Sequence, residues 1–290
     1  MLNVKRENQL KSSLFGDFLG RLMKTAAAKI GVVLLVFMVL VCFVGPLLSP
    51  YEKNGIDLNN MYAKPSADHL FGCDAMGRDI LTRLLYGGQY SLILGLTTAA
   101  VSSFISILIG CIAGYFGGVT ETLIMRFMDV WSALPGMLLA IMVSAVMGAG
   151  FFATVFALTI GGIAGGVRMT RGQILAERKK EYIEAAESIN CSKLSIMFRH
   201  LLPNVVQPMI IIATMNIGAT IMMAAGLSYI GLGIQPPTPE WGAMLADGRA
   251  YIRLYPHMIT FPGIAIALTV LAVNLIGDGL RDALDPKLRD

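Results

Sequence analysis

The chain has 290 residues, of which 55% are hydrophobic and 14% are charged, and its mean hydropathy is +0.66. Soluble domains carry roughly 25% charged residues, and their apolar residues recur at intervals instead of in unbroken blocks. The blocks in this chain predict an all-α polytopic membrane protein and exclude collagen, coiled coils and disordered tails. The net charge of +4 comes without a basic stripe interleaved with aromatics, so nucleic-acid binding is not expected.

The first apolar block, residues 30–48, contains no charged residue. A helix of this length spans about 28 Å, close to the roughly 30 Å hydrocarbon core of a bilayer. We predict a first transmembrane helix here, preceded by a cytoplasmic segment at 1–29. No small-x-small cleavage site follows the block, which indicates an uncleaved anchor.

Residues 49–90 are predicted to form an extracytoplasmic loop. Within it, the octet DILTRLLY at 79–86 places four aliphatic side chains on one helical face, as expected for a short helix lying flat on the outer interface. Gly87 and Gly88 are expected to end this helix, because glycine is common just past a helix C-terminus.

Five further apolar blocks predict a core at 91–277, followed by a cytoplasmic tail at 278–290. The second block contains Arg126 and Asp129, which we expect to pair near the membrane edge, because a lone charge at the bilayer centre costs roughly 2.5–3.5 kcal/mol. It also contains Pro135, and we still predict one helix. The predicted helices occupy residues 91–115, 122–147, 150–167, 208–234 and 257–276.

The distribution of Lys and Arg predicts the orientation of these six helices. Sixteen lie in the N-terminal segment, the 168–205 loop and the tail, against six in the two long loops on the other side. Because positive charge is enriched on the cytoplasmic side, both termini are predicted to be cytoplasmic.

Small residues and cysteines are predicted to serve packing. Four small-xxx-small pairs mark close helix contacts, either within the chain or with a partner: Gly110 with Gly114, Gly114 with Gly118, Gly161 with Gly165, and Gly162 with Gly166. The cysteines form no CxxC pair and are expected to be buried: Cys42, Cys73, Cys111 and Cys191.

The longest cytoplasmic loop, residues 168–205, predicts a helical hairpin. EYIEAAESI forms a short helix with an apolar stripe at Tyr182, Ala185, Ala186 and Ile189. Asn190 follows as a left-handed C-cap. Ser192 caps a second helix, which Pro203 is expected to end. Periodicity alone leaves open whether the hairpin covers the bundle or docks a partner.

The residues of this loop resemble the EAA loop of ABC-importer permeases. EAA at 184–186 and HLLP at 200–203 flank Asn190, where that family has glycine; asparagine tolerates the same left-handed conformation. The resemblance implies that the first helix inserts into an ATPase subunit. It then assigns ATPase coupling to Tyr182, Ile183, Glu184, Ala185, Ala186, Ile189, Asn190, Leu202 and Pro203.

Three other segments, 65–79, 227–249 and 274–289, resemble permeases of peptide and nickel importers, with Cys73 in place of the family threonine. The chain resembles the second of two permease subunits in a dipeptide, oligopeptide or nickel importer. The resemblance implies a type I importer fold in the bacterial inner membrane. The implied partners are a homologous permease, two ATPase subunits and an extracytoplasmic substrate-binding protein.

No Walker A motif appears in the sequence. We therefore expect no enzymatic activity, no catalytic residue and no cofactor bound by this chain, with ATP and Mg²⁺ held by the partner ATPases. A stand-alone secondary transporter or channel is the alternative class. It has little support, because the central spans offer chiefly Asn216 and Asn274 as strongly polar groups. An intramembrane hydrolase lacks a nucleophile and base pair.

Short peptides are the favoured substrate, and nickel remains the alternative. Imidazole and thiolate suit nickel, but we interpret the polar residues of 65–79 as caps and ion pairs, and predict no metal ligand among Asp68, His69, Cys73, Asp74, Arg78 and Asp79. QPPTPEW at 235–241 predicts a rigid outer cap, with Trp241 anchored at the interface. The sequence does not identify substrate-binding residues.

Overall fold

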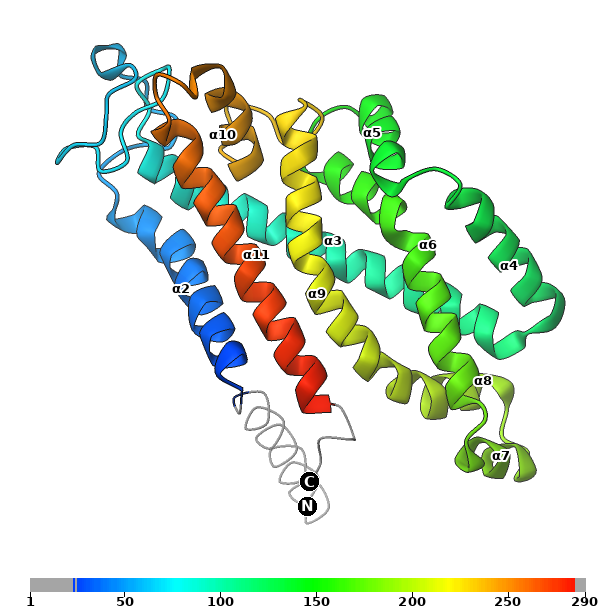
Figure 1. Cartoon of the computed structure of the whole chain (residues 1–290). Helices are drawn as coiled ribbons and strands as arrows, with labels where there is room; N and C mark the ends of the chain where they lie inside the picture. Colours follow the sequence, from blue (N-terminus) through cyan, green and yellow to red (C-terminus); the bar gives the residue numbers. More distant parts are fainter. Residues whose placement is uncertain (1–22, 24, 285–290) are drawn as a thin grey trace.

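The computed structural model describes residue 23 and residues 25–284, and in this part of the chain the regular structure is helical (Figure 1). Five helices are long and apolar enough to cross a membrane, or six if one bent pair is a single span. This confirms the predicted all-α, multi-span class. The helices are α2 (Ala26–Leu48), α3 (Ile80–Phe116), α4 (Gly118–Trp131), α5 (Gly136–Met147), α6 (Phe151–Glu177), α7 (Glu181–Ser188), α8 (Lys193–Ser195), α9 (Leu202–Tyr229), α10 (Trp241–Gly248) and α11 (His257–Leu284), with short turns η1 (Leu58–Asn60), η2 (Ile196–Leu201) and η3 (Arg249–Tyr251).

The predicted interfacial helix at 79–86 is wrong, because α3 runs without a break from Ile80 to Phe116. Gly87 and Gly88 lie inside this helix. A Cβ atom on Gly88 would come within 2.2 Å of Cys42 Sγ and 2.7 Å of the Trp241 ring. These glycines therefore permit close packing of α3 against its neighbours and do not end a helix.

The single helix predicted at 122–147 is also wrong. α4 and α5 meet at a 79° bend across Ser132–Pro135, because a proline ring and its missing N–H interrupt the helical ladder. The expected pairing of Arg126 with Asp129 is present at 3.9 Å, although both side chains are exposed, and Asp129 lies closer, 3.1 Å, to Arg168.

Other boundaries differ from prediction mainly in length. α6 continues ten residues beyond the predicted end at 167, and α11 continues through Leu284, eight residues beyond the predicted end at 276. α9 ends at Tyr229, five residues before the predicted end. The predicted 1–29 segment and the last residues of the tail lie mostly outside the described residues.

Helix α3 forms the centre of the bundle and packs against α2, α6 and α9 (Figure 1). Its contact with α6 depends on small residues: a Cβ on Gly110 would lie 2.5 Å from Thr170, and one on Gly114 2.8 Å from Ile174. Between α5 and α6, a Cβ on Gly161 would lie 2.6 Å from the carbonyl oxygen of Gly136. The contacts of Gly110, Gly114 and Gly161 therefore occur within the chain, whereas a Cβ on Gly118 or Gly165 would meet nothing within 4 Å.

The start of α2 and the end of α11 lie at the same end of the molecule as α7 (Figure 1). The loop after α2, together with α10, lies at the opposite end. This arrangement agrees with the predicted orientation, in which the 168–205 loop and both termini share the cytoplasmic side.

Candidate functional site: the α7 hairpin and the outer polar cluster

The turn after α7 has the predicted conformation. Asn190 adopts φ 58°, in the left-handed region, and Cys191 N–H donates to Ala186 O at 3.1 Å across the turn. Ser192 then caps α8, accepting a hydrogen bond from Ser195 N at 3.2 Å. The predictions for Asn190 and Ser192 are confirmed, and α7 projects at one end of the bundle (Figure 1).

The predicted apolar stripe on α7 is partly wrong. Ile183 and Ala186 are the buried residues, exposed by 2% and 4%, and they join a cluster that includes Ile174 and Leu201. Ile183 was outside the predicted stripe. Tyr182, Glu184, Ala185 and Ile189 are instead exposed, with Ile189 at 77%. The hairpin turns its inner face to the bundle and leaves apolar surface uncovered, because eight residues form little more than two turns and bury only one narrow stripe.

The second predicted helix does not end at Pro203. α8 passes through the π-helical turn Ile196–Leu201 directly into α9, so Lys193–Tyr229 forms one long helical segment. Pro203 lies in the first turn of α9, directly after this π-helical turn, so the missing N–H removes a donor but does not end the helical segment. Leu202 is half-buried beside the α7 cluster, while Pro203 is exposed.

Two residues that the sequence did not indicate, Glu177 and Asn204, hold α7 against the spans by hydrogen bonds with Tyr182. Tyr182 donates its hydroxyl to Glu177 Oε1 at 2.6 Å, and Asn204 Nδ2 donates to the Tyr182 hydroxyl at 3.2 Å. Partial burial and the hydrogen bond to Glu177 raise the pKa of Tyr182 to about 12. Glu177 is the last residue of α6 and Asn204 lies in the first turn of α9, so only the folded geometry reveals that Tyr182 joins them.

Because the pKa of Tyr182 is raised on folding, the hydrogen bond from Tyr182 to Glu177 is complete below about pH 10 and is lost as the pH rises toward 12.

We expect Tyr182→Phe to weaken the attachment of α7 to the bundle at neutral pH. The loss of about 1 kcal/mol from these exposed hydrogen bonds accelerates amide hydrogen exchange in α7 about fivefold. Ser188→Ala is the control, because its hydroxyl bonds only Glu184 O within α7; equal exchange in both variants would refute the link.

The buried side chains of α7, Ile183 and Ala186, also belong to a cluster that includes residues of α3. Tyr115 belongs to the same buried cluster as Ile183, and the Arg178 guanidinium lies 5.4 Å from the Tyr115 ring centroid. Arg178 also donates to Gly114 O at 3.3 Å. The buried residues of α7 therefore lie in one packed cluster with residues of α6, α9 and the central helix α3.

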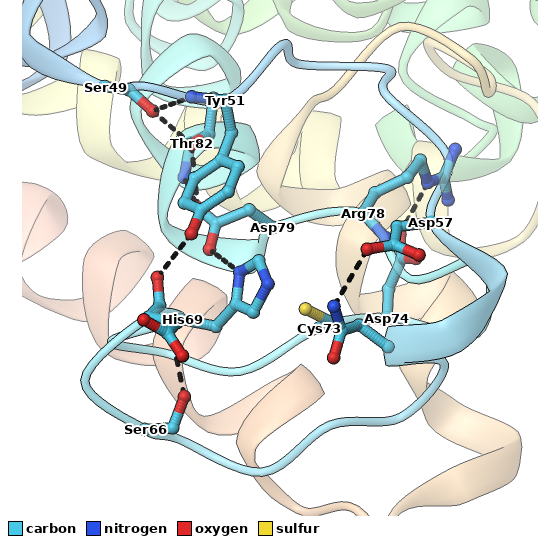
Figure 2. A network of polar contacts seen from close by, with 12 residues as sticks. Ser49, Tyr51, Asp57, Ser66, His69, Cys73, Asp74, Arg78, Asp79 and Thr82 are labelled. Atoms are coloured by element: carbon cyan, nitrogen blue, oxygen red, sulfur yellow. Dashed lines mark hydrogen bonds and ion pairs between the residues drawn. The ribbon is translucent and has the colours of Figure 1, made fainter.

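At the opposite end, the polar residues of 65–79 form the predicted caps and ion pairs (Figure 2). Asp79 caps α3 through Thr82 N at 2.7 Å, and its other oxygen lies 3.0 Å from His69 Nδ1. Asp74 pairs with Arg78 at 2.6 Å. Burial raises the pKa of the neighbouring Cys73 thiol to about 11, which disfavours the thiolate that binds metals.

The prediction that Trp241 anchors at the outer membrane interface is wrong. Its side chain is completely buried, and the indole Nε1 donates to Leu84 O at 2.9 Å. Glu240, 2% exposed, caps α10 through Ala243 N and accepts a hydrogen bond from Ser91 at 2.9 Å. Trp241 therefore locks α10 onto α3 instead of anchoring in the lipid interface. Three cysteines are buried and Cys191 is partly so, as expected.

Comparison with known proteins decides the family. Residues 106–290 match the family described as binding-protein-dependent transport system inner membrane component. The chain belongs to this family. Residues 13–65 also match the N-terminal transmembrane domain of oligopeptide transport permease C, so the resemblance seen in the sequence is confirmed, and this permease subunit is a multi-pass protein of the bacterial inner membrane.

Several relatives cover nearly all of the permease. Glutathione transport system permease protein GsiD of Escherichia coli O6:K15:H31 is 43% identical over 274 residues, covering 94% of this chain and 90% of the relative. GsiD of Pectobacterium atrosepticum is 42% identical over 289 residues, covering 99% and 96%. An inward-facing structure of the MetNI methionine ABC transporter matches with a TM-score of 0.54 at 18% identity, covering 70% of this chain and 97% of that one. The fold is that of a type I importer permease.

Proposed function

We propose that this permease forms half of the pathway of an ATP-driven importer for short peptides. The proposal rests on the family and on relatives named for transport of glutathione, itself a tripeptide. The match to an oligopeptide permease domain supports the same substrate class. The nickel alternative lacks this support, because His69 and Asp74 are engaged by Asp79 and Arg78.

The observation that carries the coupling role is the division of α7 into two faces. Ile183 and Ala186 anchor the helix, while Ala185 and Ile189 present small and apolar surface to the outside. Exposed apolar surface beside a rigid anchor suits a partner protein. The proposed partner is one of two ATPase subunits that hold ATP and Mg²⁺, with a second permease beside the bundle and a substrate-binding protein on the outer side.

Transport by the assembled complex tests this function. The complex, purified through a tag on this permease and placed in lipid vesicles with its binding protein, is supplied with ATP and labelled trialanine, glutathione or chelated nickel. We expect ATP-dependent uptake of at least one tripeptide and none of nickel. Uptake of nickel alone, or peptide uptake by this permease without an ATPase, would overturn the proposal.

A further inference from the structure

A cavity of about 410 Å³ lies among the middle segments of α3, α6 and α9. Its volume falls in the range of roughly 300–1,000 Å³ that is usual for ligand sites. Gly162 and Gly165 line it on α6 and face open space: a Cβ on Gly162 would have its nearest neighbour 3.7 Å away, and one on Gly165 would have none within 4 Å. Asn216, which the sequence marked as a polar residue of a span, lines it on α9.

The polar residues that line this cavity are uncharged, and the rest of the lining is glycine and apolar residues. Helix α3 supplies the hydroxyls of Thr98, Ser102 and Ser103, and α9 supplies the amide of Asn216 and the hydroxyl of Thr220. None of the lining residues is ionisable. Exposed polar groups at membrane depth are disfavoured against lipid and are tolerated where they line a water-filled cavity. The lining therefore suits a solvated, neutral ligand group.

The hydroxyl of Thr98 provides an independent observation. Its side chain is 2% exposed, lines the cavity and has no hydrogen-bond partner. Six other threonine hydroxyls in the described helices donate to the carbonyl four residues earlier: Thr122, Thr154, Thr170, Thr214, Thr260 and Thr269. Thr159 in α6 also lacks a partner, but it does not line the cavity. A buried hydroxyl left unsatisfied is costly, and its retention calls for a partner that the chain itself does not supply.

We propose that this cavity is a transient binding site for the peptide backbone, with the Thr98 hydroxyl bonding a substrate amide or carbonyl group. The inference rests on the proposed peptide import. Hydroxyls and carboxamides both donate and accept, so they match the N–H and C=O groups that every peptide shares. Because the lining has no fixed charge, peptides of different side-chain charge are accommodated alike.

Thr98→Val tests the site in the same vesicles. With saturating binding protein, we expect the number of peptides imported per ATP hydrolysed to fall about three- to tenfold, the value of one neutral hydrogen bond. The loss is equal for Ala-Ala-Ala, Ala-Lys-Ala and Ala-Glu-Ala, and Thr98→Ser restores import. The thermal stability of the complex is unchanged or higher, because the variant removes an unsatisfied group.

Thr269→Val is the matched control, since Thr269 is completely buried in α11 but bonds Ala265 O at 2.9 Å. We expect its import to be unchanged. Normal import by Thr98→Val, or a loss confined to one side-chain charge, overturns the site while leaving peptide import established. A loss of stability in Thr98→Val shows that the hydroxyl already has a partner within the assembled complex, and also overturns it. Failure of the unsubstituted complex to import any peptide refutes the proposed function itself.

Discussion

Gly161→Leu is expected to prevent α5 from packing on α6. A Cβ atom at Gly161 would lie 2.6 Å from the carbonyl oxygen of Gly136. The obstacle is backbone and cannot rotate away, so the two helices must separate. Overpacking costs about 1–3 kcal/mol, and we expect the upper end here because nothing nearby can yield. The measurement is the melting temperature of the purified complex and the fraction of chain that assembles.

Gly172→Leu is the control for this effect on the same helix. Gly172 is exposed, and a Cβ atom there meets nothing within 4 Å. It introduces the same side chain and removes the same backbone freedom, but should leave assembly and melting close to those of the unsubstituted complex. Equal melting temperatures for the two leucine variants would show that the Gly136–Gly161 contact does not hold α5.

Ile189→Glu is expected to reduce ATP-driven uptake at least tenfold without unfolding the permease. Ile189 is 77% exposed, so a carboxylate there remains solvated in the free chain. In a docked complex the same carboxylate is buried without a partner, which costs several kcal/mol. The measurements are uptake into vesicles and the amount of ATPase that copurifies with the permease.

Leu70→Glu provides the matched change at the opposite end of the molecule. Leu70 is 61% exposed, and it lies in the loop between α2 and α3. We expect ATPase copurification to be unchanged in this variant. If Ile189→Glu retains as much ATPase as Leu70→Glu, α7 is not the docking element.

The α7 hairpin shows how far sequence alone can lead. Asn190 and Ser192 were correctly assigned because caps depend on neighbouring residues and local backbone geometry. The buried face was only partly correct: Ala186 is buried as predicted, but Tyr182 and Ile183 both have apolar side chains, and only the position of the bundle selects Ile183 for burial. Local rules fix how a helix ends, while tertiary packing decides which side it buries.

The transmembrane helices show the same contrast between local sequence rules and tertiary packing. Hydropathy located each apolar block, but not the role of the glycines within α3. Gly87 and Gly88 followed the pattern of a helix end. They instead allow Cys42 and Trp241 to approach, and these residues lie about 45 and 150 positions away. Thr98 was missed for a related reason, since an unsatisfied hydroxyl is recognised only when its surroundings are known.

Site-specific cross-linking tests the coupling role of α7 most directly. A photoreactive side chain at Ala185, which is exposed beside the buried Ala186, is irradiated in native membranes, and the captured protein is identified by mass spectrometry. Cross-linking to an ATP-binding subunit, with none from the same group at Leu70, is the predicted result. Capture of no ATP-binding subunit from Ala185, in membranes where the complex actively imports peptide, would contradict the account.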